Sequence, residues 1–201
     1  MPTFWTIEER DQFLALIRDP GVVLARDPKE HIQSIEIFTI ALYTGMRRGE
    51  ILGLKCDSVD LERRTIKVGK LYETTKSTRD REIPLHERVY EILRLKKNKP
   101  NDSLIFDIGY PGWINGFKDL CKRAGIKPIR FHDMRHTFTA ILVSNGVPLA
   151  VIQELLGHSK IETTMVYAHL VPGTAANCLS ALNGPTTTAS RKAENVVQIA
   201  N

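Results

Sequence analysis

Residues 131–146 read FHDMRHTFTAILVSNG, and they combine a helical pattern with two side chains that suit an anion. Phe138 and Leu142 lie at the spacing of one helical face, within an apolar run that ends at a glycine. His132 and Arg135 are three residues apart, so a helix places them on the same face. A guanidinium matches two phosphate oxygens, and an imidazole can donate or transfer a proton near neutral pH. The stretch therefore predicts a helix that presents an anion site.

Similar side chains lie on both sides of this stretch. Arg47 lies two residues after Gly45, which is expected to end a helix. His158 directly follows Gly157 at another expected helix end. Tyr167 lies nine residues beyond His158. Two guanidiniums, two imidazoles and a phenol suit in-line attack at a phosphodiester, because they supply oxygen anchors, a proton donor and a nucleophile.

The positive charge of the chain is concentrated in one segment. The 201 residues carry a net charge of +5, and residues 63–81 alone hold seven Lys or Arg against two Asp or Glu. Residues 1–62 are acidic, with a net charge of −4. A solvated surface hairpin would explain the basic segment, and so would binding to an anionic partner. The candidate residues for binding such a partner are Arg63, Arg64, Lys67, Lys70, Arg79 and Arg81.

The patterning predicts one α+β domain that is mainly helical and contains a small three-stranded antiparallel sheet. Capping signals and apolar periodicity predict helices over residues 7–17, 28–45, 50–52, 87–97, 113–124, 131–145, 149–156 and 161–170. Three short strands are expected at residues 65–68, 71–75 and 81–84. Beyond Pro172 the chain becomes small and polar, which predicts a tail or one weak helix.

Several protein classes are excluded by the composition. No apolar run approaches the ~20 residues of a membrane span, and the first residues do not form a secretory signal. The three cysteines, Cys56, Cys121 and Cys178, lack CxxC spacing and are expected to be thiols in a reducing cytoplasm. His132 and His136 have the i,i+4 spacing of a metal-binding pair, but Arg135 between them would repel a cation. We expect no metal, and we expect His136 to pack or cap rather than react.

Three segments together resemble a known family. TGMRRGEILGL, FHDMRHTF and LLGHSKIETTMVYAHL, in this order and with a TK-containing basic hairpin, resemble the tyrosine recombinases of the phage integrase type. The resemblance extends from about residue 6 to residue 171. It implies the mainly helical catalytic fold of that family and the cleavage and rejoining of DNA strands.

The resemblance also implies catalytic roles. Tyr167 would attack the scissile phosphate and form a 3′-phosphotyrosyl link, while Arg47 and Arg135 would hold the non-bridging oxygens. Lys76 would protonate the leaving 5′-oxygen, with Lys70 as the second candidate because it also lies in a strand turn. His132 would act in acid–base transfer.

Two further residues match the family pattern. His158 would hydrogen-bond the phosphate, and Glu50 would orient Arg47 or its helix without taking part in the chemistry. The resemblance implies neither a metal ion nor ATP, because a tyrosyl ester preserves the energy of the phosphodiester and the cations stabilise the developing charge.

The domain organisation implied by the resemblance is a catalytic domain at 1–171 and a C-terminal tail at 172–201. The tail would be a segment exchanged between subunits, with residues 174–182 as its candidate helix. The family's N-terminal core-binding domain is expected to be absent from this sequence. The implied partners are double-stranded DNA, further copies of the chain in a tetramer on DNA, and accessory DNA-bending proteins, with no membrane partner. The implied location is the cytoplasm, on the nucleoid.

Two other functions remain open at this point. A type IB topoisomerase uses similar Arg, Lys, His and Tyr chemistry, although the LGHS segment close to Tyr167 favours a recombinase. A non-catalytic DNA-binding module of the same fold is the third alternative, and the intact set of candidate catalytic residues argues against it.

Overall fold

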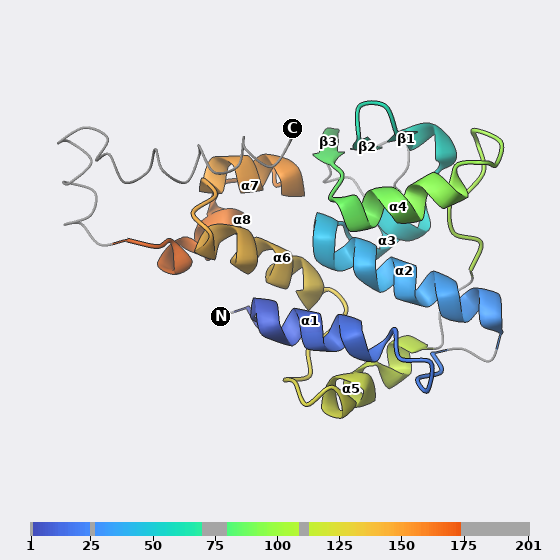
Figure 1. The fold of residues 1–201 in the computed structure, drawn as a ribbon. Coiled ribbons are helices and arrows are strands. Elements are labelled where there is room, and N and C mark those ends of the chain that lie inside the picture. Colours follow the sequence, from blue (N-terminus) through green and yellow to red (C-terminus); the bar gives the residue numbers. More distant parts are fainter. Residues whose placement is uncertain (1, 25–26, 70–79, 109–112, 174–201) are drawn as a thin grey trace, which may run out of the picture.

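The fold is built around one long helix, α2 (Pro28–Thr44), in the computed structural model of the chain. The structure describes residues 2–24, 27–69, 80–108 and 113–173. In Figure 1, helix α2 runs across the centre of the molecule, with the sheet on one side and α1 on the other. The observed fold is the predicted one, mainly helical with a small three-stranded antiparallel sheet.

Most of the predicted helices are present, and their ends lie within two residues of the predicted ones. The other α-helices are α1 (Ile7–Leu16), α3 (Arg48–Leu52), α4 (Glu87–Lys96), α5 (Trp113–Arg123), α6 (Asp133–Ser144), α7 (Leu149–Leu156) and α8 (Glu162–Met165). Two 3₁₀ turns are η1 (Cys56–Ser58) and η3 (Ala168–Leu170). The single helix predicted over residues 161–170 is wrong, because α8 and η3 are separate and Tyr167 lies between them. None of the helices in the described ranges is long and apolar enough to cross a membrane.

The sheet has the strand order β1-β2-β3, with both pairs antiparallel. The strands are β1 (Val59–Asp60), β2 (Thr65–Val68) and β3 (Arg81–Pro84). The prediction is confirmed for β2 and β3, which pair directly with Val68 opposite Arg81. The strand predicted at 71–75 lies outside the described residues, and β1 is a strand that the sequence reading missed.

Helix α2 begins and ends where the sequence signals place it. The Asp27 side chain accepts a hydrogen bond from the amide of Glu30 at 2.9 Å, and Pro28 occupies the first turn. At the other end Gly45 has φ of +64°, and a Cβ there would lie 2.5 Å from the Phe138 ring on α6. Glycine therefore allows both the left-handed turn and the close approach of α2 to α6.

The main hydrophobic core contains a cluster of aromatic rings from three helices. Phe13 on α1, Phe38 on α2 and Phe117 on α5 have ring centroids 5.1 to 5.4 Å apart. Trp5 joins the cluster, 5.0 Å from the Phe13 ring, and its side chain is fully buried. These contacts fix α1 and α5 against α2, in agreement with their neighbouring positions in Figure 1.

A second, smaller apolar cluster lies at the other end of α6. Val143, Ile152, Leu156 and Tyr167 form its buried part, which joins α6, α7 and the segment after α8. Because Met134 near the start of α6 belongs to the main core, this one helix packs into both clusters. Helix α6 thereby sets the position of Tyr167 relative to α2.

The aromatic cluster predicts a clear stability effect. Phe13→Ala removes a fully buried ring and leaves a cavity among three others, so we expect the free energy of unfolding to fall by about 3–5 kcal/mol in urea denaturation. Ile32→Ala on α2 is the control, because that side chain is 55% exposed and should change stability by less than about 0.5 kcal/mol. Equal losses in the two variants would contradict the packing described here.

Candidate active site

A cavity of about 490 Å³ lies among α6, α7, the α8–η3 segment and the turn between α2 and α3. It brings together five of the six predicted catalytic residues, namely Arg47, His132, Arg135, His158 and Tyr167. These residues span 121 positions of the chain, so the fold and not local sequence gathers them. Lys76 lies outside the described residues, as do Lys70 and Arg79.

Arg135 connects two helix ends at the floor of this site. Its guanidinium donates from Nη1 to the carbonyl of Gly45 at 2.8 Å and from Nη2 to the carbonyl of Leu156 at 2.6 Å. Gly45 caps α2 and Leu156 ends α7, so the cation lies at the negative ends of two helix dipoles. Burial and the charge of Arg47 lower the pKa of Arg135 to about 9, which leaves it cationic at neutral pH.

Glu50 on α3 holds two arginines at once. Its buried carboxylate accepts hydrogen bonds from Arg47 Nη1 at 3.1 Å and from the Arg47 amide at 2.7 Å. The same carboxylate accepts two bonds from Arg81, from Nη1 at 3.0 Å and from Nη2 at 2.7 Å. The arrangement agrees with the expectation that Glu50 orients Arg47, and it adds a second arginine that the sequence reading did not place here.

Arg81 lies in the protein interior, and this corrects the prediction that it contacts DNA. Its side chain is 2% exposed, and its Nε also donates to the carbonyl of Leu155 at 2.8 Å. On β3, Arg81 and Ile83 share the buried face, while Glu82 and Pro84 face outward. The alternation of the strand therefore directs this guanidinium into the interior, where Glu50 neutralises it.

The position of Gly157 is coupled to the same ion pair. Gly157 caps α7 with φ of +66°, and a Cβ there would lie 3.0 Å from the Arg81 side chain. Glycine therefore allows the chain to turn toward His158 directly beside the buried guanidinium.

The site contains more positive than negative charge. Burial alone would raise the pKa of Glu50, but the hydrogen bonds and charge of Arg81 and the Arg47 amide outweigh burial and hold it below its usual range. Glu50 is thus a carboxylate at neutral pH, and it faces the guanidiniums of Arg47, Arg81 and Arg135. One anion among three cations makes the cavity suited to a further anion such as a phosphate.

His158 lines the cavity, and its imidazole is neutral at pH 7. Burial first, and then the charges of Arg135 and Arg47, lower its pKa to about 4. Its Nδ1 lies 2.9 Å from the Thr164 hydroxyl. In the tautomer that accepts a hydrogen bond from Thr164, Nε2 carries the proton and can donate it to a phosphate oxygen.

His132 occupies the N-cap position of α6, at the edge of the same cavity. Burial and the neighbouring charge of Arg135 lower its pKa, which the carboxylate of Asp133 partly opposes. A proton that His132 accepts at this position is therefore readily released, as acid–base transfer requires.

Tyr167 is, with Thr139, among the most enclosed polar groups of the cavity. The residue is 2% exposed, and burial raises the pKa of its phenol to about 12, although the charge of Arg135 acts in the opposite direction. Its hydroxyl contacts Nδ1 of His136 on α6. His136, which the sequence reading expected to pack or cap, lines the cavity and contacts this hydroxyl. Its only sequence signal was its position one helical turn beyond His132, since the contact joins residues 31 positions apart.

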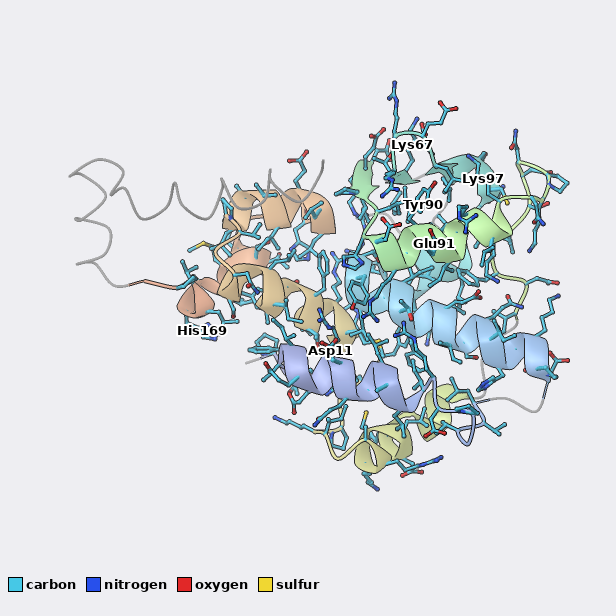
Figure 2. The ribbon with its side chains drawn as sticks, viewed as in Figure 1. Asp11, Lys67, Tyr90, Glu91, Lys97 and His169 are labelled. Atoms are coloured by element: carbon cyan, nitrogen blue, oxygen red, sulfur yellow. The ribbon has the colours of Figure 1, made fainter. Side chains whose placement is uncertain are left out.

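Apart from Arg81, the described cations of the basic segment are exposed on or beside the sheet. Arg64 pairs with Glu87 at 2.7 Å, and its guanidinium lies 4.2 Å from the centroid of the Tyr90 ring. The Lys67 side chain is 57% exposed, and Figure 2 places it at the outer side of the sheet. Arg63 is 73% exposed near Asp60. Within the described ranges no three His, Cys, Asp or Glu side chains gather as metal ligands.

The comparisons with known proteins agree on one family. The sequence profile of the Phage integrase family matches residues 22–173 of this chain. Tyrosine recombinase XerA of Saccharolobus solfataricus is 35% identical over 137 residues, which are 67% of this chain and 45% of that protein. The integrase of Salmonella phage P22 is 30% identical over 159 residues, or 72% of this chain and 40% of that protein. The chain thus spans about half the length of these relatives.

Solved structures show the same likeness in three dimensions. The catalytic domain of bacteriophage HP1 integrase superposes with a TM-score of 0.66 and 26% identity, covering 93% of this chain and all of that chain. The XerH site-specific recombinase, solved in a post-cleavage complex with its difH substrate, gives a TM-score of 0.66 and 26% identity, over 84% of this chain and 50% of that one.

The buried ion pair of this site can be tested by a double-mutant cycle. Glu50→Gln leaves Arg81 buried without its counter-charge, and we expect the free energy of unfolding to fall by about 3–5 kcal/mol. Arg81→Met removes two of the hydrogen bonds to Glu50 and leaves this buried carboxylate with Arg47 alone, so the double variant should lose much less than the sum of the two single losses. Additive losses in thermal or urea unfolding would contradict the pairing.

Proposed function

The chain belongs to the phage integrase family, the tyrosine recombinases, and from this premise we propose that it cleaves and rejoins DNA strands through a 3′-phosphotyrosyl intermediate. The observation that carries the proposal is the cavity in which the buried hydroxyl of Tyr167 and the buried guanidinium of Arg135 meet. A scissile phosphate seated there would have a nucleophile and a cation within one enclosed, positively charged space.

The residues of the cavity divide the chemistry among them. Tyr167 attacks phosphorus, and its oxygen replaces the 5′-oxygen of the next nucleotide. Arg135 and Arg47 stabilise the charge on the non-bridging oxygens, and the preorganisation of Arg47 by Glu50 supports this role. His158 donates a hydrogen bond from its neutral ring to the same phosphate.

Proton transfer completes the reaction. Lys76 is proposed to protonate the leaving 5′-oxygen, and His132 takes part in acid–base transfer at the edge of the cavity. The tyrosyl ester preserves the energy of the phosphodiester, so a 5′-hydroxyl from either duplex can reverse the step without ATP. The guanidiniums supply the charge stabilisation, and the proposal therefore assigns no role to a metal ion.

The proposed substrate is double-stranded DNA. Arg63, Arg64 and Lys67 are exposed cations on the sheet, and each DNA phosphate that they neutralise lowers the logarithm of the binding constant by ~0.9 per tenfold rise in salt. We further propose that the chain acts as a tetramer on DNA, with accessory DNA-bending proteins, on the nucleoid of the cell. These three points rest on the family to which the chain belongs.

A nicked suicide substrate tests the proposal directly. Cleavage of such a duplex releases a short fragment that diffuses away, so the covalent protein–DNA adduct accumulates and is counted on a denaturing gel. We expect an adduct from the wild type, none from Tyr167→Phe, and retained mobility-shift binding in both. Tyr90→Phe is the matched control and should form the adduct at the wild-type level, because Tyr90 lies under Arg64 and away from the cavity.

Two outcomes would redirect the proposal. An adduct that persists in Tyr167→Phe would exclude this residue as the nucleophile. Relaxation of supercoiled DNA without exchange between two duplexes would favour topoisomerase activity over recombination.

A further inference from the structure

His136 has a contact with the nucleophile that the proposed roles leave unused. We propose that His136, and not His132, accepts the proton of Tyr167 when its oxygen attacks the phosphate. The inference rests on the proposed function, because it concerns the first chemical step at the same site. Its central observation is the contact between His136 Nδ1 and the Tyr167 hydroxyl.

The surroundings of Tyr167 make a nearby proton acceptor necessary. The side chain lies in the apolar cluster with Val143, Ile152 and Leu156, and the residue is 2% exposed. Bulk water therefore cannot readily take the proton, and a phenol whose pKa is raised by burial releases it least readily when no acceptor is present. His136 directly follows Arg135 on α6, and its ring centroid lies 6.0 Å from that of Tyr167.

Asp133 lies on the opposite side of the imidazole. Its carboxylate is 3.9 Å from His136 Nε2, and it also pairs with Arg130 at 2.9 Å. A carboxylate beside Nε2 favours the tautomer that carries the proton there, which leaves the lone pair of Nδ1 directed at the tyrosine hydroxyl. Asp133, His136 and Tyr167 thus form a carboxylate–imidazole–hydroxyl series, with Asp133 as a positioning residue.

His136 is in the protonation state that accepting a proton requires. Burial lowers its pKa, as do the positive charges of Arg130 and Arg135 and the neighbouring His132, whereas Asp133 raises it. The imidazole is therefore largely neutral near pH 7. His132 is less well placed, because among the described residues no hydrogen bond joins it to Tyr167, and its ring meets that of His136 edge-on at 5.5 Å.

The step balances as a proton transfer coupled to phosphoryl transfer. The O–H bond of Tyr167 breaks and its proton moves to His136 Nδ1, while the phenolate oxygen forms the bond to phosphorus. The bond from phosphorus to the 5′-oxygen breaks, and that oxygen takes a proton from the general acid. In religation the charges move in reverse, and the protonated His136 returns its proton to the departing tyrosine oxygen.

The test is the single-turnover cleavage rate on the suicide substrate as a function of pH. His136→Asn keeps a polar atom near the position of Nδ1 but cannot take up a proton, so we expect its cleavage rate to fall by about 10²- to 10⁴-fold with mobility-shift binding unchanged. In the wild type the rate should decline on the acid side as His136 becomes protonated, and His136→Asn should lack that decline. His169→Asn is the matched control at the wild-type rate, because His169 is exposed and lies at the outer edge of η3 in Figure 2.

A second measurement separates proton transfer from a loss of local structure. A fluorinated tyrosine at position 167 has a more acidic phenol, so it needs a proton acceptor less. It should restore more of the cleavage rate in His136→Asn than it adds in the wild-type background. Equal acceleration in both backgrounds would overturn the inference.

The outcomes distinguish this inference from the proposed function. Wild-type adduct formation together with His136→Asn cleavage within a few-fold of wild type would overturn the role of His136 alone. A slow His136→Asn that keeps the acid-side decline would assign the proton to another group. Absence of any wild-type adduct would overturn the proposed function and the inference with it.

Discussion

The buried guanidinium of Arg135 is the interaction on which the rest of the site depends. It holds the carbonyl of Gly45 and the carbonyl of Leu156, and so it joins the last turns of α2 and α7 through a cation on α6. Because Gly45 and Leu156 directly precede the turns that carry Arg47 and His158, the same two hydrogen bonds set where these side chains enter the cavity. Neither carbonyl neutralises the guanidinium as a carboxylate would, so the cation remains available to attract a phosphate.

The second constraint is the pairing of Glu50 with Arg81, which fixes the sheet to α3 and α7. One buried carboxylate orients Arg47 toward the cavity and neutralises Arg81, whose Nε reaches the end of α7. Such a pair contributes little net stability compared with an apolar core, but its geometry is specific, and breaking one half is costly. The sheet, Arg47 and the end of α7 are therefore held together through one buried ion pair.

The sequence predicts the local features well and the tertiary contacts less well. The limits of α2 followed from Pro28 and Gly45, because helix start and stop signals depend on neighbouring residues alone. Arg81 was assigned to DNA because it belongs to a basic run, whereas strand alternation with Ile83 directs it inward. His136 was dismissed because its partner, Tyr167, is reached only after α7 folds back against α6. The interruption of the helix at Tyr167 was missed for the same reason. The conformation of residues 161–170 depends on how Tyr167 packs into the smaller apolar cluster, which the periodicity of these residues does not reveal.

A crystal structure with vanadate and two oligonucleotides, one ending in a 3′-hydroxyl and one in a 5′-hydroxyl, tests the central claim most directly. Vanadate adopts the trigonal bipyramid of a phosphoryl-transfer transition state, so it shows which groups touch the reacting atoms. The account predicts the Tyr167 oxygen at an apical position with His136 Nδ1 beside it, and Arg135 and Arg47 on the equatorial oxygens. A vanadate bound with water or another side chain in place of Tyr167, or without any contact to Arg135, would contradict it.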